Sequence, residues 1–472
     1  MVAVLASCGL VASFMQTLVI PLIPSLPTLL HTNATDASWV ITVTLLAAAV
    51  ITPVSGRLGD LYGKRPVLLA SVAVLVAGSV VSALADSLLP MVVGRGLQGC
   101  AMGVIPLGIS IMRDILPAER VGTAIAMMSA TLGVGGAVGL PVSAIIAETS
   151  SWRVLFWLAA GLGAACLTLL WLFVPDSPLR APARFDIVGT IGLAAGLVSL
   201  LIAIVKGASW GWGSPTTLGL FAAAVVILVV WGAFELRTKH PLVDLRVSAR
   251  RPVLFTNLAS VLVGFSMYSA SLVLPQLLQA PAMTGYGLGQ SMVAAGLWMA
   301  PGGLVMMALS PVSARITRLR GPRTSLVIGA SIIAVGYLAS TLLLHNAFEI
   351  MLAVVFVSAG VGIAYAAMPG LIMGSVPPHE TASANGLNAL MRSVGTSVSS
   401  AVMATLLAHM TFSVGALTVP SLTGFRVAFL IAAGAAILGV LVTLLVPRPG
   451  KRGDDAGAVP GVETQERREL QV

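Results

Sequence analysis

The thirteen residues from Pro53 to Arg65 read PVSGRLGDLYGKR and interrupt two long apolar runs with charges and glycines. Five of the thirteen are Arg, Lys, Asp or Tyr, in a chain in which only 9% of the residues are charged. A second stretch, PVSARITRLRGPR, occupies residues 311–323 and repeats seven of the thirteen residues at identical spacing. A charged turn that recurs at such a distance predicts a chain built from two related halves.

The composition identifies the surrounding medium as lipid. The chain has 472 residues, of which 57% are hydrophobic, and its mean hydropathy is +1.00. Soluble proteins carry roughly a quarter charged residues, so most of this surface cannot face water. Apolar runs of about twenty residues, such as 66–85 and 428–446, fit membrane-spanning helices, whereas barrel strands alternate apolar and polar residues over about ten. The predicted fold class is therefore all-α, in a polytopic membrane protein.

Apolar windows predict fourteen spans. Their approximate cores are 2–22, 39–54, 66–85, 89–112, 121–147, 152–173, 186–205, 216–234, 254–278, 288–314, 324–344, 348–374, 385–408 and 426–446. With both termini in the cytoplasm, twenty-one Lys and Arg residues fall on the inner side and three fall on outer loops or their borders. Cytoplasmic loops are rich in Lys and Arg, so this bias supports an even number of spans and the cytoplasmic membrane as the location.

The repeat divides the chain further. The first copy joins spans 2 and 3 and the second joins spans 10 and 11, so two extra spans separate two six-helix halves. We expect an N-terminal bundle over residues 1–174, a linker with two transmembrane helices over 175–252, a C-terminal bundle over 253–447 and a disordered cytoplasmic tail over 448–472.

Several functional classes are disfavoured. The net charge of +9 is explained by membrane topology, so no nucleic-acid partner is expected. The three cysteines lie in apolar runs without metal-ligand spacing. GRGLQG at 94–99 matches a dinucleotide pattern, but it lies within an apolar helix rather than after a strand. We predict no enzyme activity, no cofactor and no metal.

The interruption also carries a family resemblance. Its pattern G-x-L-x-D-x-x-G-[RK]-[RK] is formed by Gly56, Leu58, Asp60, Gly63, Lys64 and Arg65. This pattern resembles the signature loop of the major facilitator superfamily. Further matches are Trp39, RGLQG at 95–99, Arg113–Asp114, Glu119–Arg120 and Trp152–Arg153. With fourteen spans and a central pair, nearly the whole chain resembles the fourteen-helix drug:proton antiporter branch, which implies two six-helix bundles plus two central helices.

The loop itself is predicted to act as a gate. Gly56 and Gly63 permit close approach and a tight turn. Asp60 can accept hydrogen bonds from amides at a helix N-terminus, or pair with a cation such as Arg113. Lys64 and Arg65 are expected to meet lipid phosphates. The gating-loop candidates are Gly56, Arg57, Asp60, Gly63, Lys64, Arg65 and Arg113; the alternative is a loop that sets topology alone.

Two cations lie inside predicted spans. Arg95 is costly at membrane depth unless it faces a cavity or a partner, and the resemblance implies a role in proton coupling; snorkelling is the alternative. Arg392 lies closer to the cytoplasmic end, so snorkelling is nearly as good an explanation as cavity lining. The candidate cavity residues are Gln16, Thr17, Arg95, Gln98, Ser266, Tyr268, Gln276 and Arg392.

The fifth span is rich in small residues. Gly133, Gly135, Gly136, Gly139 and Pro141 predict close helix packing and a kink. They resemble the family's exporter motif, although Gly139–Leu140–Pro141 replaces the usual Gly-Pro. Packing alone would also explain them.

Carboxylates are missing from the middle of every predicted span. The branch usually has an Asp where this chain has Met15. Glu148 and Asp36, both near the outer face, are therefore the proton-coupling candidates together with Arg95, since burial can raise a carboxyl pKa towards neutrality. A solvated helix-end acid is the competing interpretation of Glu148.

These features predict a secondary active transporter that exports amphipathic drugs or specialised metabolites by proton antiport and alternating access. Its expected partners are a small-molecule substrate, protons and the lipid bilayer, and we expect a monomer. One alternative is a weakly coupled facilitator or a dedicated single-metabolite exporter, which Met15 favours. A remote alternative is a sensor or scaffold that does not transport.

Overall fold

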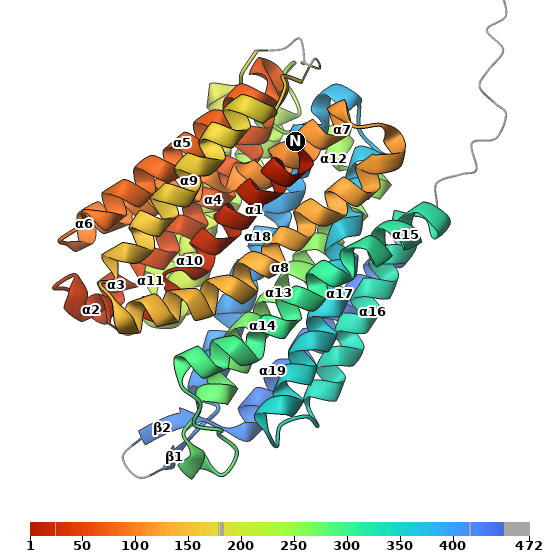
Figure 1. The fold of residues 1–472 in the computed structure, drawn as a ribbon. Coiled ribbons are helices and arrows are strands. Elements are labelled where there is room, and N and C mark those ends of the chain that lie inside the picture. Colours follow the sequence, from red (N-terminus) through yellow and green to blue (C-terminus); the bar gives the residue numbers. More distant parts are fainter. Residues whose placement is uncertain (24, 178, 180–183, 415–416, 448–472) are drawn as a thin grey trace, which may run out of the picture.

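The protein is a bundle of long, nearly parallel helices (Figure 1). The structure is a computed structural model that describes residues 1–23, 25–177, 179, 184–414 and 417–447. The predicted tail at 448–472 lies outside the described residues. The all-helical expectation is confirmed, apart from a short hairpin in which β1 (Thr411–Val414) pairs antiparallel with β2 (Leu417–Pro420), with Thr411 opposite Pro420.

The first half contains α1 (Val2–Thr17), α2 (Leu26–Leu29), α3 (Ala34–Ala37), α4 (Trp39–Tyr62), α5 (Lys64–Ala83), α6 (Leu88–Cys100), α7 (Val104–Ile115), α8 (Ala118–Thr149) and α9 (Arg153–Phe173). The central segment contains α10 (Ile187–Trp210), α11 (Pro215–Glu235) and α12 (Leu245–Ser248). The second half contains α13 (Arg251–Gln279), α14 (Met292–Ala308), α15 (Ser310–Arg320), α16 (Pro322–Ser340), α17 (Ala347–Met373), α18 (Thr381–His409) and α19 (Leu422–Leu444). Single 3₁₀ turns lie at Ile20–Leu22, Ala101–Gly103, Ala282–Thr284 and Pro378–Glu380.

The number of spans agrees with the sequence prediction. Within the described residues, thirteen helices are long and apolar enough to cross a membrane, and α1 is a shorter apolar helix of 16 residues. At 1.5 Å per residue α1 alone is shorter than a hydrocarbon core of about 30 Å. The turn at Ile20–Leu22 continues its path after Thr17.

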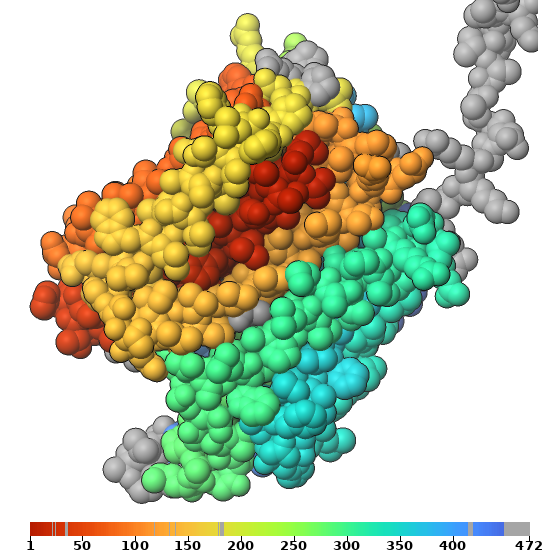
Figure 2. All heavy atoms as spheres, viewed as in Figure 1, coloured from red at the N-terminus to blue at the C-terminus, as the bar shows by residue number. Residues whose placement is uncertain are grey.

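Two large hydrophobic cores lie in separate parts of the chain. One is formed almost entirely by residues 5–174, with only Met373 and Ala382 added from the second half. The other is formed by residues 259–446. Figure 2 shows the two groups as adjoining masses, with α8 of the first half lying along α14 of the second. Each half therefore packs largely on itself.

The central pair covers one side of this seam. Leu193, Leu197 and Leu201 of α10 share a smaller apolar cluster with Ala49 of α4 and Leu390 of α18. α11 packs mainly against α10 and buries little of its own surface. Lys206 lies near the end of α10, where it is 3% exposed.

Contacts gather the charged connections at one end of the molecule. Lys64 at the start of α5 contacts Asp114 at the end of α7, and Ser177 after α9 donates to the same carboxylate. Asp60 contacts the start of α18. The β1–β2 hairpin lies at the opposite end (Figure 1). We call the first of these ends the Asp60 end.

Candidate functional site

Asp60 joins the two halves at the Asp60 end. Its side chain is fully buried near the end of α4. Oδ1 accepts a hydrogen bond from the amide of Ala382 at 3.2 Å, and Oδ2 accepts from the amide of Ser383 at 2.7 Å and from its hydroxyl at 2.5 Å. A carboxylate at a helix N-terminus satisfies free amides and interacts favourably with the helix dipole. Asp60 with Ala382 and Ser383 is called the latch below.

Glycines allow α4 and α18 to approach closely enough for the latch to form. A Cβ on Gly56 would lie 2.4 Å from the carbonyl oxygen of Ala382. A Cβ on Gly386 would lie 2.8 Å from the carbonyl oxygen of Thr52. Gly63 ends α4 with φ of 106°, a backbone conformation that residues with a side chain rarely adopt. The first two positions set the distance between the helices, and the third turns the chain directly into α5.

Lys64 lies between two carboxylates next to the latch. Its Nζ is 2.5 Å from Asp114 Oδ2 and 3.9 Å from Asp60 Oδ1, and its side chain is 0% exposed. It also donates to Thr381 Oγ1 at 3.3 Å. The expectation that Lys64 meets lipid phosphates is wrong. Lys64 instead neutralises two buried carboxylates, whose charges would be costly inside the protein without a cation.

The remaining cations of the loop take different positions. Arg65 donates to the carbonyl of Trp171 at 2.7 Å and to Asp176 at 3.4 Å, which ties α5 to the end of α9. Arg113 is half-buried, and its Nη1 has no partner among the described residues. The expected pairing of Arg113 with Asp60 is wrong, since Lys64 and α18 occupy that carboxylate. Arg57 is 6% exposed and lines a cavity beside the latch that is described below.

Arg95 crosslinks helices inside the first half. It is 2% exposed, and it donates to Gln98 Oε1 at 2.6 Å, to the carbonyl of Met15 at 3.1 Å and to that of Val40 at 3.4 Å. Gln98 is fully buried and donates to Ser79 Oγ at 2.8 Å. In this conformation neither side chain faces open space, so cavity lining by Arg95 and Gln98 stays a prediction.

Arg392 belongs to a polar network in the second half. Its guanidinium lies 4.1 Å from the ring centroid of Tyr365, and its Nη1 donates to Asn388 Oδ1 at 3.3 Å. Asn388 in turn donates to Asn257 at 2.9 Å and Ser260 at 2.7 Å. One turn earlier on α18, Asn385 is 4% exposed, and neither polar atom of its amide has a hydrogen-bond partner among the described residues. Arg392 is therefore held by protein groups rather than free to snorkel.

The other cavity candidates are dispersed. Gln16 is exposed and donates to Met102 Sδ at 3.0 Å, while Thr17 is half-buried and donates to the carbonyl of Phe14. Ser266 is fully buried and donates to the carbonyl of Ala432 on α19. Tyr268 is half-buried and Gln276 is exposed. The structure does not bring these residues into one site.

The coupling candidates lie at helix ends. Glu148 is exposed near the end of α8. Asp36 is half-buried in α3, where its Oδ2 accepts from Asn33 Nδ2 at 2.7 Å and its amide donates to Asn33 Oδ1 at 2.8 Å. No partner of Glu148 is recorded among the described residues. Their role in proton coupling stays a prediction.

Four of the five span-5 residues lie against neighbouring helices. A Cβ on Gly135 or Gly139 would lie 2.5 Å or 2.2 Å from side-chain atoms of α1, and one on Gly133 would lie 2.5 Å from Met306 of α14. Pro141 lies against Gly296 of α14. A Cβ on Gly136 would meet none of the described residues within 4 Å, so the expectation of close packing there is wrong. α8 thus contacts α1 within its own half and α14 across the seam.

Three residues that form these contacts were not predicted from the sequence. Ser383 carries no distinguishing pattern, because a helix-cap serine depends on which side chain approaches it. Asp114 was noted for its motif, yet its pairing with Lys64 joins residues fifty positions apart. Lys206 lies 4.6 Å from the ring centroid of Trp39 and donates to Ser38 Oγ. Its position at the end of an apolar run was the available signal.

Comparison with known proteins assigns the chain to a family. The family model described as Major Facilitator Superfamily matches residues 5–400. The chain belongs to the major facilitator superfamily. It is accordingly an integral, multi-pass membrane transporter of small molecules and not an enzyme.

The superfamily relatives are distant. The chain is 25% identical over 463 residues to the "Uncharacterized MFS-type transporter YcnB" of Bacillus subtilis, with 97% of each chain covered. It is 28% identical to the "Tetracenomycin C resistance and export protein" of Streptomyces glaucescens, with 82% of this chain and 71% of the relative covered. The solved structure of the human organic anion transporter MFSD10 (TETRAN) has a TM-score of 0.67 at 16% identity, with 94% of this chain and 98% of that chain covered. This last likeness concerns the fold alone.

Proposed function

We propose that the protein exports amphipathic small molecules, drugs or specialised metabolites, across the cytoplasmic membrane by alternating access and proton antiport. The observation that carries the proposal is the latch. A carboxylate of the first half holds the first amides of a helix in the second half, and such a contact can be broken and remade when the halves rock. The export direction draws on relatives that include an antibiotic export protein.

In this proposal the Asp60 end faces the cytoplasm and is closed in the structure. The connections at that end carry most of the Lys and Arg residues, as cytoplasmic loops do. Both termini lie on the same side, and the protein acts as a monomer. Opening requires α4 and α18 to separate, which removes three hydrogen bonds from Asp60 and exposes its charge.

A transport assay with a pH gradient tests the coupling. Purified protein in liposomes receives an ethidium-like dye, and dye movement is followed with and without an imposed gradient. We expect gradient-dependent movement that is lost in Glu148→Gln. Glu119→Gln is the matched control, because Glu119 is also an exposed acid on α8 but lies at its opposite end. Gradient-dependent movement that persists in Glu148→Gln and in Asp36→Asn would remove both residues from the coupling path.

The second candidate function is a facilitator or single-metabolite exporter with little proton coupling. It is favoured by Met15, whose backbone carbonyl accepts from Arg95 at 3.1 Å where the resembled branch has an Asp. Dye movement that ignores the gradient supports this candidate. The absence of movement for every substrate offered, in protein that binds them, supports the sensor or scaffold instead.

A further inference from the structure

A cavity beside the latch is not accounted for by transport. It has a volume of about 240 Å³ and lies at the junction of α4, the connection from α11 to α13, and the start of α18. Drug-sized ligands occupy pockets of about 300–1,000 Å³. The cavity therefore suits a smaller group than a transported drug.

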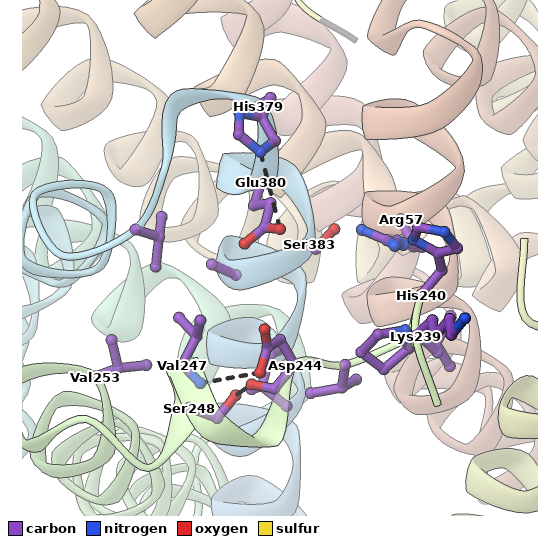
Figure 3. Close-up of a pocket in the computed structure, with 16 residues that line it drawn as sticks. Arg57, Lys239, His240, Asp244, Val247, Ser248, Val253, His379, Glu380 and Ser383 are labelled. Carbon is purple, nitrogen blue, oxygen red and sulfur yellow. Dashed lines mark hydrogen bonds and ion pairs between the residues drawn. The ribbon is translucent and has the colours of Figure 1, made fainter. Parts of the chain in front are cut away.

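Arg57 brings a buried positive charge to the cavity, whose lining also includes Lys239 and the carboxylates of Asp244 and Glu380. Its side chain is 6% exposed, it forms no ion pair within 4 Å among the described residues, and its Nε has no hydrogen-bond partner. Figure 3 shows its guanidinium reaching from α4 into the cavity towards Ser383, with Lys239 and His240 beside it. A buried guanidinium N–H without an acceptor is unfavourable, so the geometry favours an acceptor that the chain itself does not supply.

Among the described residues, none of the acidic side chains nearby lies within ion-pair distance of the Arg57 guanidinium. Asp244 accepts from the amides of Arg246 at 2.9 Å and Val247 at 3.1 Å, as the cap of α12. Glu380 lies 4.0 Å from His379. Glu235 does not line the cavity; its Oε2 accepts from the amide of Leu242, and its Oε1 has no hydrogen-bond partner among the described residues.

We propose that this cavity binds a phosphate group, held by Arg57 and Lys239 with His240 and His379 as further hydrogen-bond donors. Planar guanidinium groups bind phosphate through paired charge-assisted hydrogen bonds. The ligand bridges the first half, the central segment and the second half. Its binding stabilises the closed Asp60 end and slows the opening that transport requires. The effect on transport rests on the proposed function, whereas the binding does not.

The repeat supplies a matched control. Arg315 occupies in the second copy of the loop the position that Arg57 occupies in the first. Arg315 is exposed and does not line the cavity. Lys239 is exposed on the rim, so Lys239→Gln tests the site without disturbing the packing of α4.

The experiment measures the thermal unfolding midpoint of the full chain. In the first arm, delipidated protein in detergent is titrated with inorganic phosphate against potassium chloride of equal ionic strength. In the second arm, protein in phosphatidylcholine nanodiscs is compared with protein in nanodiscs that also contain phosphatidic acid. The first arm reports a soluble phosphate and the second a lipid headgroup.

We expect wild type and Arg315→Gln to gain the same upward shift in at least one arm. Losing a charged hydrogen-bond donor weakens binding by about tenfold or more, so Arg57→Gln and Lys239→Gln should need correspondingly more ligand. If Arg57→Gln does not fold, Lys239→Gln alone decides. No shift of the wild type in either arm, or equal shifts in all four proteins, overturns the proposal.

Discussion

At the scale of single residues, Asp60 and Lys64 have different roles, although they lie close together at the end of α4 and the start of α5. Asp60 reaches across the seam, whereas Lys64 mainly neutralises buried carboxylates within the first half. The second copy of the loop has Arg318 and Pro322 at these positions. Of the two copies of the loop, only the first therefore supplies a carboxylate to the latch, and Arg318 in the second copy is exposed.

Replacing Asp60 with Asn should cut transport by about tenfold or more, because hydrogen bonds to a charged acceptor contribute about 1.5–3 kcal/mol each. The amide retains one acceptor oxygen and no charge. Transport in liposomes and protein abundance in the membrane are the measurements, and abundance should be unchanged. Arg318→Gln is the matched control and should transport normally. Transport at the wild-type rate in Asp60→Asn would refute the latch.

Replacing Lys64 with Met should destabilise the protein by about 3–5 kcal/mol, because Asp114 is left as a buried charge without its cation. Thermal unfolding in detergent measures this loss. Changing Asp114 to Leu in the same protein should restore much of the stability, since no unpaired charge then remains there. If the double variant is no more stable than Lys64→Met, the ion pair does not explain the burial of Lys64.

At the scale of elements, the contact between α4 and α18 depends on residues without side chains. Gly56 and Gly386 each face backbone carbonyls of the other helix, so the two helices meet through main-chain atoms. Backbone atoms cannot move aside as a flexible side chain does. Any added carbon must therefore separate the helices.

Gly56→Ala should weaken the closed state, because the new Cβ would lie 2.4 Å from the carbonyl of Ala382. Gly136→Ala on α8 is the control, because its Cβ would meet nothing within 4 Å. Ala is favoured over Gly inside helices by about 1 kcal/mol, so this control should be neutral or slightly more stable. Unfolding midpoints of the two variants measure the difference. A Gly56→Ala protein as stable as Gly136→Ala would argue against the close approach.

At the scale of the whole molecule, the two cores and the seam between them allow an equilibrium between closed and open states. The latch, the glycine contact and α10 all act on the same side of the seam, at α4 and α18. The proposed phosphate site lies beside them. These features should shift one equilibrium together rather than act independently.

Thiol labelling can measure this equilibrium. In a protein whose three native cysteines are replaced, Thr381→Cys places a thiol at the start of α18, where Thr381 is fully buried. Labelling by a water-soluble maleimide should be slow, and Asp60→Asn should accelerate it about tenfold or more, by the hydrogen-bond free energies given above. Lys239→Cys, at an exposed position, should label rapidly with or without Asp60→Asn. Equal rates at position 381 in both backgrounds would show that Asp60 does not hold this end closed.

The sequence by itself determined the class of protein. Low charge and long apolar runs require helices in lipid, because backbone groups there have no water to bond. The loop pattern and its copy indicated the family and the two halves, since both are local features that repeat along the chain. The chemistry of its carboxylate alone also indicated that Asp60 can accept hydrogen bonds from the amides at a helix N-terminus.

Only the tertiary structure decided which partners these residues have. Lys64 was expected at the lipid surface and Arg113 beside Asp60. In the structure the buried carboxylates pair with Lys64 instead, and the first amides of α18 donate to Asp60. Within the part of the chain that the structure describes, Arg57 Nε and the amide of Asn385 have no hydrogen-bond partner, and the sequence shows neither fact. Hydrogen bonds and ion pairs act over a few ångströms between residues up to 323 positions apart, so they depend on how the helices pack and not on the pattern of any one of them.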